Sequence, residues 1–433
     1  MRYSEAIDFL FTSLPMYQRQ GKAAYKDNLD NTLSLDSYFG QPHRNFASIH
    51  VAGTNGKGSV SHMLASVLQA AGFKTGLYTS PHLLDFRERI KINGELIPEE
   101  QVTAFVSGNQ EFIKELKPSF FEMTVAMAFD YFSREKVDVA VIETGLGGRL
   151  DSTNIITPLL SVITNISLDH TEFLGSEVTS IAREKGGIIK EKVPLLIGRA
   201  EAPTEEVLRS MAREKEAPVL CANQLYKPRF RTLDQDGIMQ LRLGLPGDAA
   251  NLTVSCDLTG DYQQENIITA YCALEELQRL NWAIKDSHIL KGFASVGTST
   301  GILGRWQTIG HNPRSVCDTA HNPDGIAAVI AQIKQLAWKK LHMVWGMVSD
   351  KDLHAILSLL PPEATYYFCR SSVLRSMNED VLTLAAREYG LKGSAFPNVK
   401  EAFRAAQEDA GPDDMIFTGG STFVVADLLL LKK

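Results

Sequence analysis

Two hydrophobic patterns, one typical of β-strands and one typical of α-helices, follow each other repeatedly along the chain. Short runs rich in β-branched and other apolar residues predict buried strands, and longer segments with one apolar face predict helices. In the first 300 residues we expect strands at 45–53, 74–80, 137–145, 159–167 and 194–198, and helices at 57–73, 121–136 and 263–280. This order predicts a mostly parallel sheet covered by helices.

A second, shorter alternation follows and predicts another open α/β sheet. Its expected strands are 315–321, 342–347, 365–370 and 414–420, separated by helices at 325–337, 352–360, 381–390 and 400–410. A turn-rich stretch between Leu225 and Leu258 predicts a small antiparallel patch. The chain has 433 residues, which is too long for one core. We therefore expect an α/β protein with domains at 1–297 and 304–433, joined by a linker at 298–303 within the glycine-rich "SVGTSTGILGRWQ".

Charge and composition narrow the class of protein. The formal net charge is −7, which argues against a nucleic-acid-binding surface as the main function. No apolar run is long enough to predict a signal peptide or a membrane span. The five cysteines are scattered without a C-x-x-C pair, as expected for free thiols in a reducing cytoplasm. We expect a cytoplasmic monomer that binds no nucleic acid and no membrane.

The glycine-rich stretch "GTNGKGS", residues 53–59, lies between an expected strand and an expected helix. Backbone N–H groups at a helix N-terminus bind anions, and glycines let the backbone approach phosphate oxygens closely. The usual phosphate loop places a hydroxyl residue directly after its lysine, whereas here Gly58 separates Lys57 from Ser59. The alternative is a plain strand–helix turn with a surface lysine. The strand and helix on either side favour a nucleotide site, without defining the reaction.

Other chemically capable residues follow the expected strands. Ligands of open α/β sheets gather at the carboxyl ends of strands. Ser80 and His82 occupy such a position, although Ser-Pro is also common in turns, and Glu143 offers the carboxylate oxygen that Mg²⁺ prefers. The turn "GLGGRL" after Glu143 lacks the third glycine of a dinucleotide-binding loop, because that position is Leu150.

Three further turns carry histidines or hydroxyl groups. Asp169 and His170 follow a strand, and a histidine in a turn is more often structural than metal-ligating. In the second domain, the turns that contain Asp318 with His321 and Gly420 with Ser421 are equally consistent with helix caps. Lys185, in "IAREKGGIIK", has the pattern of a solvated lysine on a charged helix.

Nine segments together resemble the folylpolyglutamate synthase/dihydrofolate synthase family of the Mur ligase superfamily. They occur in the family's order between residues 50 and 422, and the resemblance as a whole extends from about residue 26 to about residue 428. The segments are "HVAGTNGKGSVSHMLASVLQAAGFKTGLYTSPHL", "RERIKINGE", "ETGLGGRLDSTN", "SLDHTEFLG", "IAREKGGII", "GRWQ", "DTAHNPDG", "GMVSDKD" and "GGST".

The resemblance implies an ATP- and Mg²⁺-dependent ligase that joins L-glutamate to the carboxylate of folates or of dihydropteroate. The γ-phosphoryl group of ATP would activate the carboxylate as an acyl phosphate, which the glutamate amine then attacks. Phosphate is a far better leaving group than the oxygen of a carboxylate, so the protein mainly positions groups and neutralises charge. A P-loop ATPase-like N-terminal domain would carry the folate site, and a Rossmann-like C-terminal domain would form the glutamate-binding side.

The family's site residues correspond to particular positions of this sequence. The resemblance implies nucleotide contacts from Thr54, Asn55, Gly56, Lys57, Gly58, Ser59, Asn266, Arg305 and Asp318. It implies Mg²⁺ ligands, for two ions, that include Ser80, Glu143 and His170, and a CO₂-carbamylated Lys185 that holds a second ion or the reacting end of the substrate. It places the acyl and pterin substrates near Tyr25, Lys26, Asp27, His82, Ser119, Leu150, Asp151 and Ser152, and glutamate near His321 and Ser421. Of these, Lys57, Lys185, His170 and His321 would take part in catalysis.

Alternative functions differ in what they leave unexplained. The segment "YKDN", Tyr25 to Asn28, is the weakest match, and it bears on whether dihydropteroate is accepted or the enzyme is a dedicated folylpolyglutamate synthase. Two further departures, isoleucines after Asn266 and Leu303 where proline is common, lie away from the chemistry. A cell-wall amide ligase is disfavoured by "TSPHL" and "RERIKING". A nucleotide-driven switch would leave Glu143 and His170 without roles.

Overall fold

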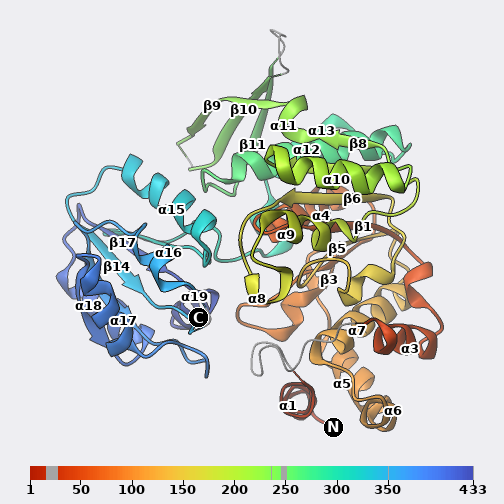
Figure 1. Cartoon of the computed structure of the whole chain (residues 1–433), viewed down its shortest axis with the longest axis horizontal. Helices are drawn as coiled ribbons and strands as arrows, with labels where there is room; N and C mark the ends of the chain where they lie inside the picture. Colours follow the sequence, from red (N-terminus) through yellow and green to blue (C-terminus); the bar gives the residue numbers. More distant parts are fainter. Residues whose placement is uncertain (16–27, 236, 245–250, 350, 433) are drawn as a thin grey trace. The chain divides into compact units, whose positions relative to one another are not determined.

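The computed structural model describes residues 1–15, 28–235, 237–244, 251–349 and 351–432 (Figure 1). These residues form two units. The first comprises Met1–Asp257 and Gln263–Ile302, and the second comprises Leu258–Tyr262 and Leu303–Lys433.

The larger sheet of the first unit is mostly parallel, as the sequence predicted. In the described chain its eight strands lie in the order β4-β3-β2-β5-β1-β6-β7-β8. The strands are β1 (Ala47–Ala52), β2 (Thr75–Tyr78), β3 (Ile90–Ile92), β4 (Glu95–Leu96), β5 (Val139–Glu143), β6 (Leu160–Asn165), β7 (Leu195–Arg199) and β8 (Val219–Cys221). Only β3 and β4 run antiparallel to their neighbours, and neither of them nor β8 was predicted.

The first unit also contains helices, and some of them pack on the faces of this sheet. They are α1 (Tyr3–Ser13), α3 (Asp30–Tyr38), α4 (Lys57–Ala70), α5 (Glu99–Gly108), α6 (Gln110–Leu116), α7 (Phe120–Arg134), α8 (Thr171–Leu174), α9 (Val178–Gly186), α10 (Ala202–Glu214), α11 (Ala222–Leu225), α12 (Gln263–Arg279), α13 (Asp286–Phe293) and α14 (Val296–Thr300), with the 3₁₀ turns η2 (Pro42–Arg44), η3 (Phe86–Arg89) and η4 (Ser152–Ile155). Helix α4 packs on β2 and β5, and α12 packs on β6 and β7. Side chains of α7 share a core with Ala140 and Ile142 of β5. Because both faces are covered, β1 and β5 are almost wholly buried.

A small antiparallel sheet confirms the predicted patch after Leu225. It consists of β9 (Lys227–Leu233), β10 (Met239–Gly244) and β11 (Asn251–Cys256), with β10 in the centre. It lies beside α11 and α12 in Figure 1.

The second unit contains the second predicted α/β sheet. Its strands lie in the order β12-β13-β17-β14-β15-β16, with β12 alone antiparallel. The elements are β12 (Gln307–His311), β13 (Arg314–Cys317), α15 (Pro323–Gln335), β14 (Leu341–Trp345), α16 (Leu353–Leu357), β15 (Thr365–Cys369), α17 (Glu379–Glu388), β16 (Lys392–Phe396), α18 (Val399–Asp409), β17 (Met415–Gly419) and α19 (Thr422–Leu430). The two unpredicted strands, β12 and β16, are the sheet's edges, and their partly exposed residues lack the apolar run that marks the central strands.

The predicted linker, 298–303, differs from the observed passage between the units. Residues 298–300 belong to helix α14, and the first unit ends only at Ile302. Thr300 is fully buried, and its hydroxyl lies 2.7 Å from Nδ1 of His62. Small polar residues therefore pack into the first unit here, although their composition is typical of a loop. The segment Leu258–Tyr262, which belongs to the second unit, was not anticipated.

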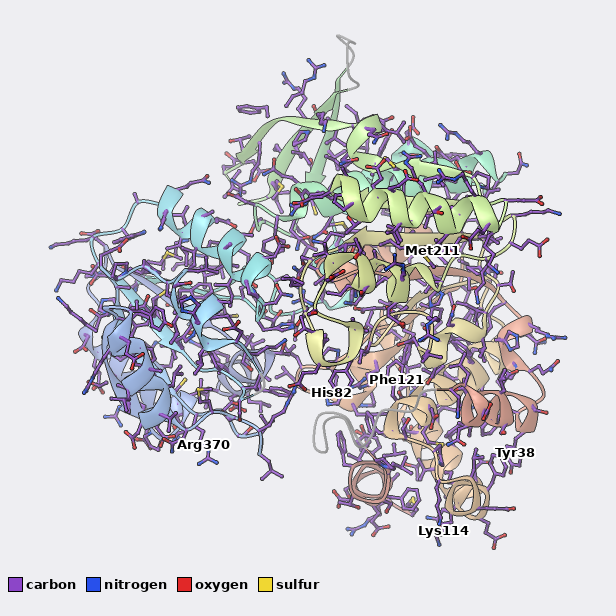
Figure 2. All side chains as sticks on the ribbon, in the orientation of Figure 1. Tyr38, His82, Lys114, Phe121, Met211 and Arg370 are labelled. Carbon is purple, nitrogen blue, oxygen red and sulfur yellow. The ribbon has the colours of Figure 1, made fainter. Side chains whose placement is uncertain are left out.

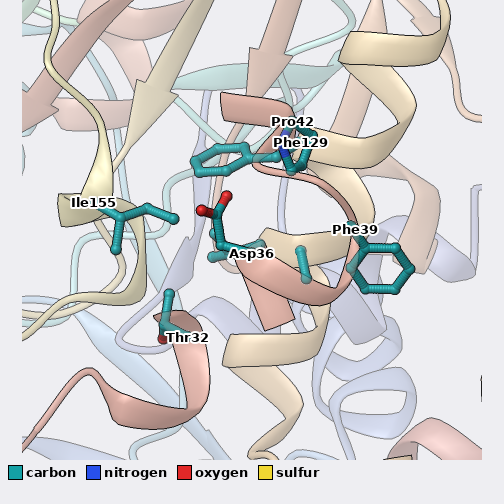
Figure 3. Close-up of a pocket in the computed structure, with 8 residues that line it drawn as sticks. Thr32, Asp36, Phe39, Pro42, Phe129 and Ile155 are labelled. Carbon is teal, nitrogen blue, oxygen red and sulfur yellow. The ribbon is translucent and has the colours of Figure 1, made fainter. Parts of the chain in front are cut away.

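The described chain has no helix suited to a membrane and contains a small hollow, drawn in Figure 3. None of its helices combines the length and apolar content needed to cross a bilayer. The hollow lies among α3, η2, α7 and η4, and no predicted site residue lines it.

Candidate active site

The glycine loop connects β1 to α4 and leaves the start of this helix open. Lys57 is the first residue of α4, and Gly56 precedes it with a left-handed φ of 85°. No side chain among the described residues caps this helix start. The first N–H groups of a helix lack intrahelical partners, and the helix dipole makes this end positive. The arrangement is suited to an anion such as a phosphate group.

The end of β6 holds the loop in place. The Asn55 N–H donates to Oδ1 of Asn165 at 2.7 Å, and the Thr164 hydroxyl donates to the Asn55 carbonyl at 2.6 Å. The Thr54 N–H donates to the Asn165 carbonyl at 2.9 Å. A Cβ at Gly53 would collide with the Thr164 hydroxyl. Thr164 and Asn165 therefore shape the loop, and both were missed because their strand reads simply as buried.

Helix α12 covers the other side of the loop. Gln263 donates to the Ser59 hydroxyl at 3.1 Å, and Asn266 donates to Oε1 of Gln263 at 2.8 Å. A Cβ at Gly56 would collide with the Asn266 amide. The predicted Asn266 thus lies directly against the loop. Gln263 was missed, although its i, i+3 spacing from Asn266 placed it on the same helix face.

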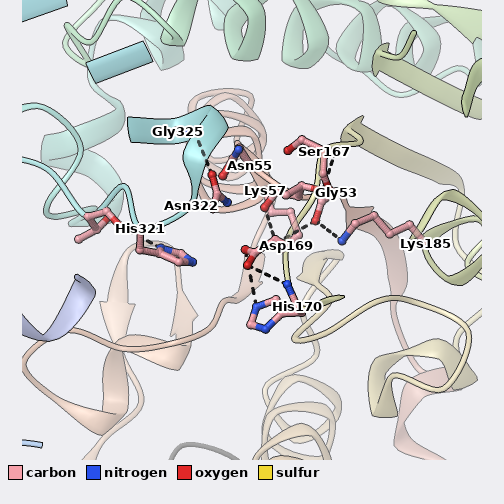
Figure 4. Close-up of polar contacts among 12 residues, drawn as sticks. Gly53, Asn55, Lys57, Ser167, Asp169, His170, Lys185, His321, Asn322 and Gly325 are labelled. Atoms are coloured by element: carbon pink, nitrogen blue, oxygen red, sulfur yellow. Dashed lines mark hydrogen bonds and ion pairs between the residues drawn. The ribbon is translucent and has the colours of Figure 1, made fainter. Parts of the chain in front are cut away.

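Two lysines converge on one carbonyl of the loop (Figure 4). Lys57 Nζ donates to the carbonyls of Gly53 at 3.0 Å and Thr54 at 3.1 Å, and Lys185 Nζ donates to the Gly53 carbonyl at 2.7 Å. Lys185 is only 4% exposed, so the simple interpretation of it as a solvated lysine was wrong. Burial, and next the charge of Lys57, lower the pKa of Lys185 to about 7.

Ser80 and Glu143 meet at the ends of two adjacent strands. Strands β2 and β5 are parallel neighbours, with Tyr78 opposite Ile142. The Ser80 N–H donates to Oε2 of Glu143 at 3.4 Å, and Glu143 is 4% exposed. No set of three or more His, Cys, Asp or Glu side chains that could hold a metal gathers within the described residues. A cation at Glu143 would need further oxygen ligands, such as hydroxyls, water or phosphate.

His170 occupies a left-handed position, with φ of 49°, immediately before the short helix α8. Its Nε2 lies 3.8 Å from Oδ2 of Asp169, and its backbone N–H donates to Oδ1 of the same carboxylate at 2.9 Å. Figure 4 shows both contacts. Asp169 therefore orients His170.

His82, labelled in Figure 2, follows β2, and the rings of Phe11 and Phe86 approach its imidazole. Its Nδ1 accepts a hydrogen bond from Nε of Arg89 at 2.7 Å. Burial, together with the Arg89 charge, lowers the pKa of His82 to about 3, so the imidazole is neutral.

The residues predicted to contact the pterin have local structural contacts. The Ser119 hydroxyl caps α7 by accepting from the Glu122 N–H at 3.2 Å, in a capping box that "SFFE" encodes. The Asp151 carboxylate accepts from the N–H groups of Gly145, Leu146 and Thr153 at 2.8 to 3.0 Å.

Asp151 therefore closes the turn that contains Leu150, and Ser152 is buried at the start of η4. Tyr25, Lys26 and Asp27 lie outside the described residues.

In the second unit, Asp318 organises the turn after β13. Its Oδ2 accepts from the Trp306 N–H at 2.7 Å and from the Tyr262 hydroxyl, and its Oδ1 accepts from the Ala320 N–H at 2.8 Å. Arg305 donates to the hydroxyl of Thr319. The structure thus brings the predicted Arg305 and Asp318 to one turn. Tyr262 was missed, because its segment precedes the rest of this unit by forty residues.

The two remaining predicted positions of this unit lie at or beside helix caps. His321 Nδ1 lies 3.1 Å from the Thr319 carbonyl, and the next residue, Asn322, caps α15 by accepting from the Gly325 N–H at 2.9 Å. The Ser421 hydroxyl caps α19 by accepting from the Phe423 N–H at 3.1 Å. Capping accounts for Ser421, whereas His321 has no capping role of its own in these contacts.

Two protein-family models match most of the chain. Residues 51–274 match the Mur ligase middle domain, and residues 304–422 match the Mur ligase glutamate ligase domain. A folylpolyglutamate synthase from Lacticaseibacillus casei is 32% identical over 98% of this chain and 97% of its own length. The chain belongs to the folylpolyglutamate synthase/dihydrofolate synthase family of Mur ligases. The resemblance expected from the nine segments is confirmed.

Other members of the folylpolyglutamate synthase/dihydrofolate synthase family differ in length. A probable bifunctional folylpolyglutamate synthase/dihydropteroate synthase from Haloferax volcanii is 33% identical over 99% of this chain, which covers 50% of that relative. The chain also spans about half, 51%, of a similar protein from Halobacterium salinarum.

Solved structures of this family share the fold over the whole chain. E. coli FolC in complex with DHPP and ADP superposes with a TM-score of 0.86 at 29% identity, covering 100% of this chain and 98% of that one. The bifunctional folylpolyglutamate synthase/dihydrofolate synthase from Yersinia pestis, complexed with AMPPNP and Mn ion, gives a TM-score of 0.82 at 26% identity, covering 100% and 98%.

Proposed function

We propose that this chain is an ATP-dependent ligase that joins L-glutamate to the carboxylate of folates and of dihydropteroate. The observation that carries the proposal is the open start of α4, braced by β6 and α12 and flanked by Lys57 and Lys185. The family's relatives, named folylpolyglutamate synthase and dihydrofolate synthase, support the same activity.

ATP would supply the phosphoryl group that converts the substrate carboxylate into an acyl phosphate. The N–H groups at the start of α4 would bind the phosphates, with Thr54, Asn55, Gly58 and Ser59 around them. Lys57 would leave the loop carbonyls and neutralise charge on the phosphates, as preorganised cations do at sites of phosphoryl transfer. The braces from Asn165 and Asn266 keep the loop in shape while Lys57 moves.

Glu143 and Ser80 fit a Mg²⁺ site beside these phosphates. The buried Glu143 carboxylate, contacted by the backbone N–H of Ser80, suits an ion that keeps water and phosphate oxygens among its ligands, and the Ser80 hydroxyl would be a further one. Mg²⁺ would neutralise charge on the phosphates when bound. His170, oriented by Asp169, would supply a further ligand. The complexes of related enzymes with ADP and with AMPPNP and Mn ion support a nucleotide and a divalent cation here.

Carbamylation of Lys185 also fits its surroundings. Only a neutral amine adds to CO₂, with loss of one proton, and a pKa of about 7 leaves a large fraction of Lys185 neutral near physiological pH. The carbamate would carry negative charge next to Lys57, and the charge that now lowers the lysine pKa would then stabilise the product. ¹³C NMR with ¹³C-bicarbonate should show one carbamate signal that is absent in Lys185→Met, and no such signal would contradict the assignment.

The second unit carries candidate residues of its own for the nucleotide and for glutamate. We propose that Arg305 and Asp318 serve the nucleotide, and that His321 and Ser421 serve the incoming glutamate. On the acyl side, His82, Ser119 and the 150–152 turn would bind the substrate, with Tyr25, Lys26 and Asp27 outside the described residues. The contacts of Ser119 and Asp151 within their own turns suggest that these two act through backbone shape.

The cytoplasm is the compartment that fits the cysteines. All five are free thiols and all are buried. A reducing compartment preserves such thiols.

The test is phosphate release from ATP with L-glutamate, run in parallel with dihydropteroate and tetrahydrofolate. Release with both acceptors supports the bifunctional enzyme, and release with tetrahydrofolate alone leaves a dedicated folylpolyglutamate synthase. Release that depends on neither acceptor would contradict the ligase and favour a nucleotide-driven switch.

A further inference from the structure

Arg89 is a buried cation that contacts His82. It is the last residue of η3, and its side chain lies in the first unit at 3% exposure. Its Nε donates to Nδ1 of His82 at 2.7 Å, and its Cζ lies 5.2 Å from the centroid of the Phe120 ring. Phe11 and Phe86 approach the imidazole at ring-centroid distances of 6.0 and 6.2 Å. Aromatic rings and a guanidinium thus fix the orientation of His82.

This hydrogen bond decides which imidazole nitrogen carries the proton. A guanidinium stays protonated in proteins, and its N–H groups only donate. Nδ1 of His82 must therefore accept through its lone pair. The ring proton is then on Nε2, which makes Nε2 a hydrogen-bond donor.

The Nε2 side of His82 has no such partner within the chain. Among residues 1–15, 28–235 and the later described segments, none accepts a hydrogen bond from Nε2. His82 follows the carboxyl end of β2, two residues after Ser80, at the edge of the sheet where ligands of α/β proteins gather.

We propose that Arg89 is a positioning residue that fixes the Nε2–H tautomer of His82, so that His82 donates a hydrogen bond to a carbonyl or carboxylate oxygen of the acyl substrate. A donor is what such a substrate requires, because its amide and carboxylate oxygens are acceptors. The inference rests on the proposed function for the identity of this substrate, whereas the tautomer assignment stands on the contact between Arg89 and His82 alone.

The first test is the tautomer itself. ¹⁵N NMR of the histidine-labelled, full-length protein, with the His82 signals identified by their loss in His82→Gln, should show a protonated Nε2 and an unprotonated Nδ1. In Arg89→Met, the His82 signals should change to a mixture of tautomers. A protonated Nδ1 in the wild-type protein would overturn the proposal.

The second test uses two substitutions that keep different parts of the imidazole. The amide nitrogen of Gln reaches the place of Nε2, whereas that of Asn reaches only the place of Nδ1. His82→Gln should keep the KM of the acyl substrate close to the wild-type value, and His82→Asn should raise it roughly tenfold, as expected for one lost hydrogen bond. The KM of ATP should stay unchanged in both. The reverse order of the two variants would contradict the proposal.

Variants at Arg89 test whether it acts through His82. Arg89→Met should raise the KM of the acyl substrate about as much as His82→Asn does, and the double variant should be no worse than either, because both remove one interaction. Arg89→Gln, which retains an N–H donor, should recover part of the loss. If Arg89→Met does not fold, the tautomer in the wild-type spectrum and the KM values of His82→Gln and His82→Asn still test the proposal. Additive effects would contradict the positioning role.

Arg87→Gln is the matched control. Arg87 lies two residues before Arg89 on the same turn, and its guanidinium pairs with Asp85 at 2.7 Å. Its substitution should leave the KM of the acyl substrate unchanged.

A wild-type protein that shows the expected tautomer but no ligation of any folate would refute the proposed function while leaving the tautomer assignment intact.

Discussion

Two strand-to-helix turns of the molecule have the same topology but differ in how the first N–H groups of the helix are capped. In the first unit β1 leads into α4, and in the second β13 leads into α15, each at the carboxyl end of a strand in a mostly parallel sheet. The start of α15 is capped by Asn322, which accepts from the Gly325 N–H. Within the described chain, no side chain caps the start of α4, where Gly56 takes the place of a capping residue.

The difference is between a helix start whose first N–H groups have no side-chain cap and one whose cap is an asparagine side chain. Ser, Thr, Asp and Asn are the usual residues before a helix, because their oxygens satisfy the first N–H groups. A glycine there leaves those groups to water or to an anion. The surroundings of α4 reinforce this contrast, because two lysines converge on the Gly53 carbonyl beside the open end.

The largest effect should come from removing the cation of the open turn. Lys57→Ala should lower ligase turnover roughly 100-fold or more, as the loss of one preorganised charge-stabilising group typically does, with an unchanged thermal transition. Lys334→Ala, which removes an exposed lysine of α15, is the control and should leave turnover unaffected. Ligase turnover and the thermal transition, measured by calorimetry, should be compared for both variants. A Lys57→Ala variant with wild-type turnover would contradict the role of Lys57 in neutralising the phosphates.

The buried Lys185 should make the free energy of unfolding depend on pH. Its pKa falls from 10.5 to about 7 on folding, mainly through burial, so between these values the unfolded chain binds more protons than the native state. The free energy of unfolding of the wild type, relative to Lys185→Met, should therefore rise from pH 7 to pH 9, by at most about 1.4 kcal/mol per pH unit. Below pH 7 the difference should be constant.

Urea unfolding in CO₂-free buffers measures this slope. A difference that stays flat, or that falls above pH 7, would show that Lys185 is not a destabilised cation in the native state. In Lys185→Ala, short-chain carboxylic acids should restore part of the lost activity if they take the place of the carbamate that we propose on Lys185.

A methyl group on the loop glycine should have a smaller effect. Gly56→Ala should lower stability through its left-handed φ and through collision with Asn266, and lower ATP affinity by distorting the loop. Gly72→Ala, at a φ of 91° with nothing within 4 Å of the added Cβ, isolates the backbone cost of about 1 kcal/mol. Urea unfolding and ATP titration of both variants measure the difference. Equal losses would mean that the contact with Asn266 does not constrain the loop.

The smallest effect should come from the capped turn. Asn322→Ala should cost about 1 kcal/mol of unfolding free energy, the usual value of a helix cap, and leave ATP affinity unchanged. The stability loss should appear in the transition of the second unit. A large loss of ATP affinity would instead make Asn322 a ligand contact and weaken the comparison.

The α/β frame and the glycine loop were predictable from the sequence, because they depend on local periods. The central strands carry apolar runs, and the loop has a strand before it and a helix after it. The edge strands β12 and β16 lack such runs and were missed. The helix α14 was missed because its glycine and small polar residues are typical of a loop.

The site was less predictable where its chemistry depends on contacts distant in sequence. Lys185 follows two charged residues of a short helix, and only the fold shows that its ammonium is buried on the Gly53 carbonyl. Gln263 and Asn165 support the loop from elements that are 100 or more residues away from it. Conversely, the roles carried by Ser119 and Asp151 came from the resemblance, and the fold gives each a local structural contact.

The most direct measurement follows an isotope through the reaction. Tetrahydrofolate labelled with ¹⁸O in its carboxylate, incubated with ATP, Mg²⁺ and L-glutamate, should yield a glutamylated product and inorganic phosphate that carries ¹⁸O. The label reaches phosphate only if the carboxylate oxygen is phosphorylated and then leaves. Phosphate that forms without ¹⁸O, or without the glutamylated product, would contradict the account of this chain as a carboxylate-activating ligase.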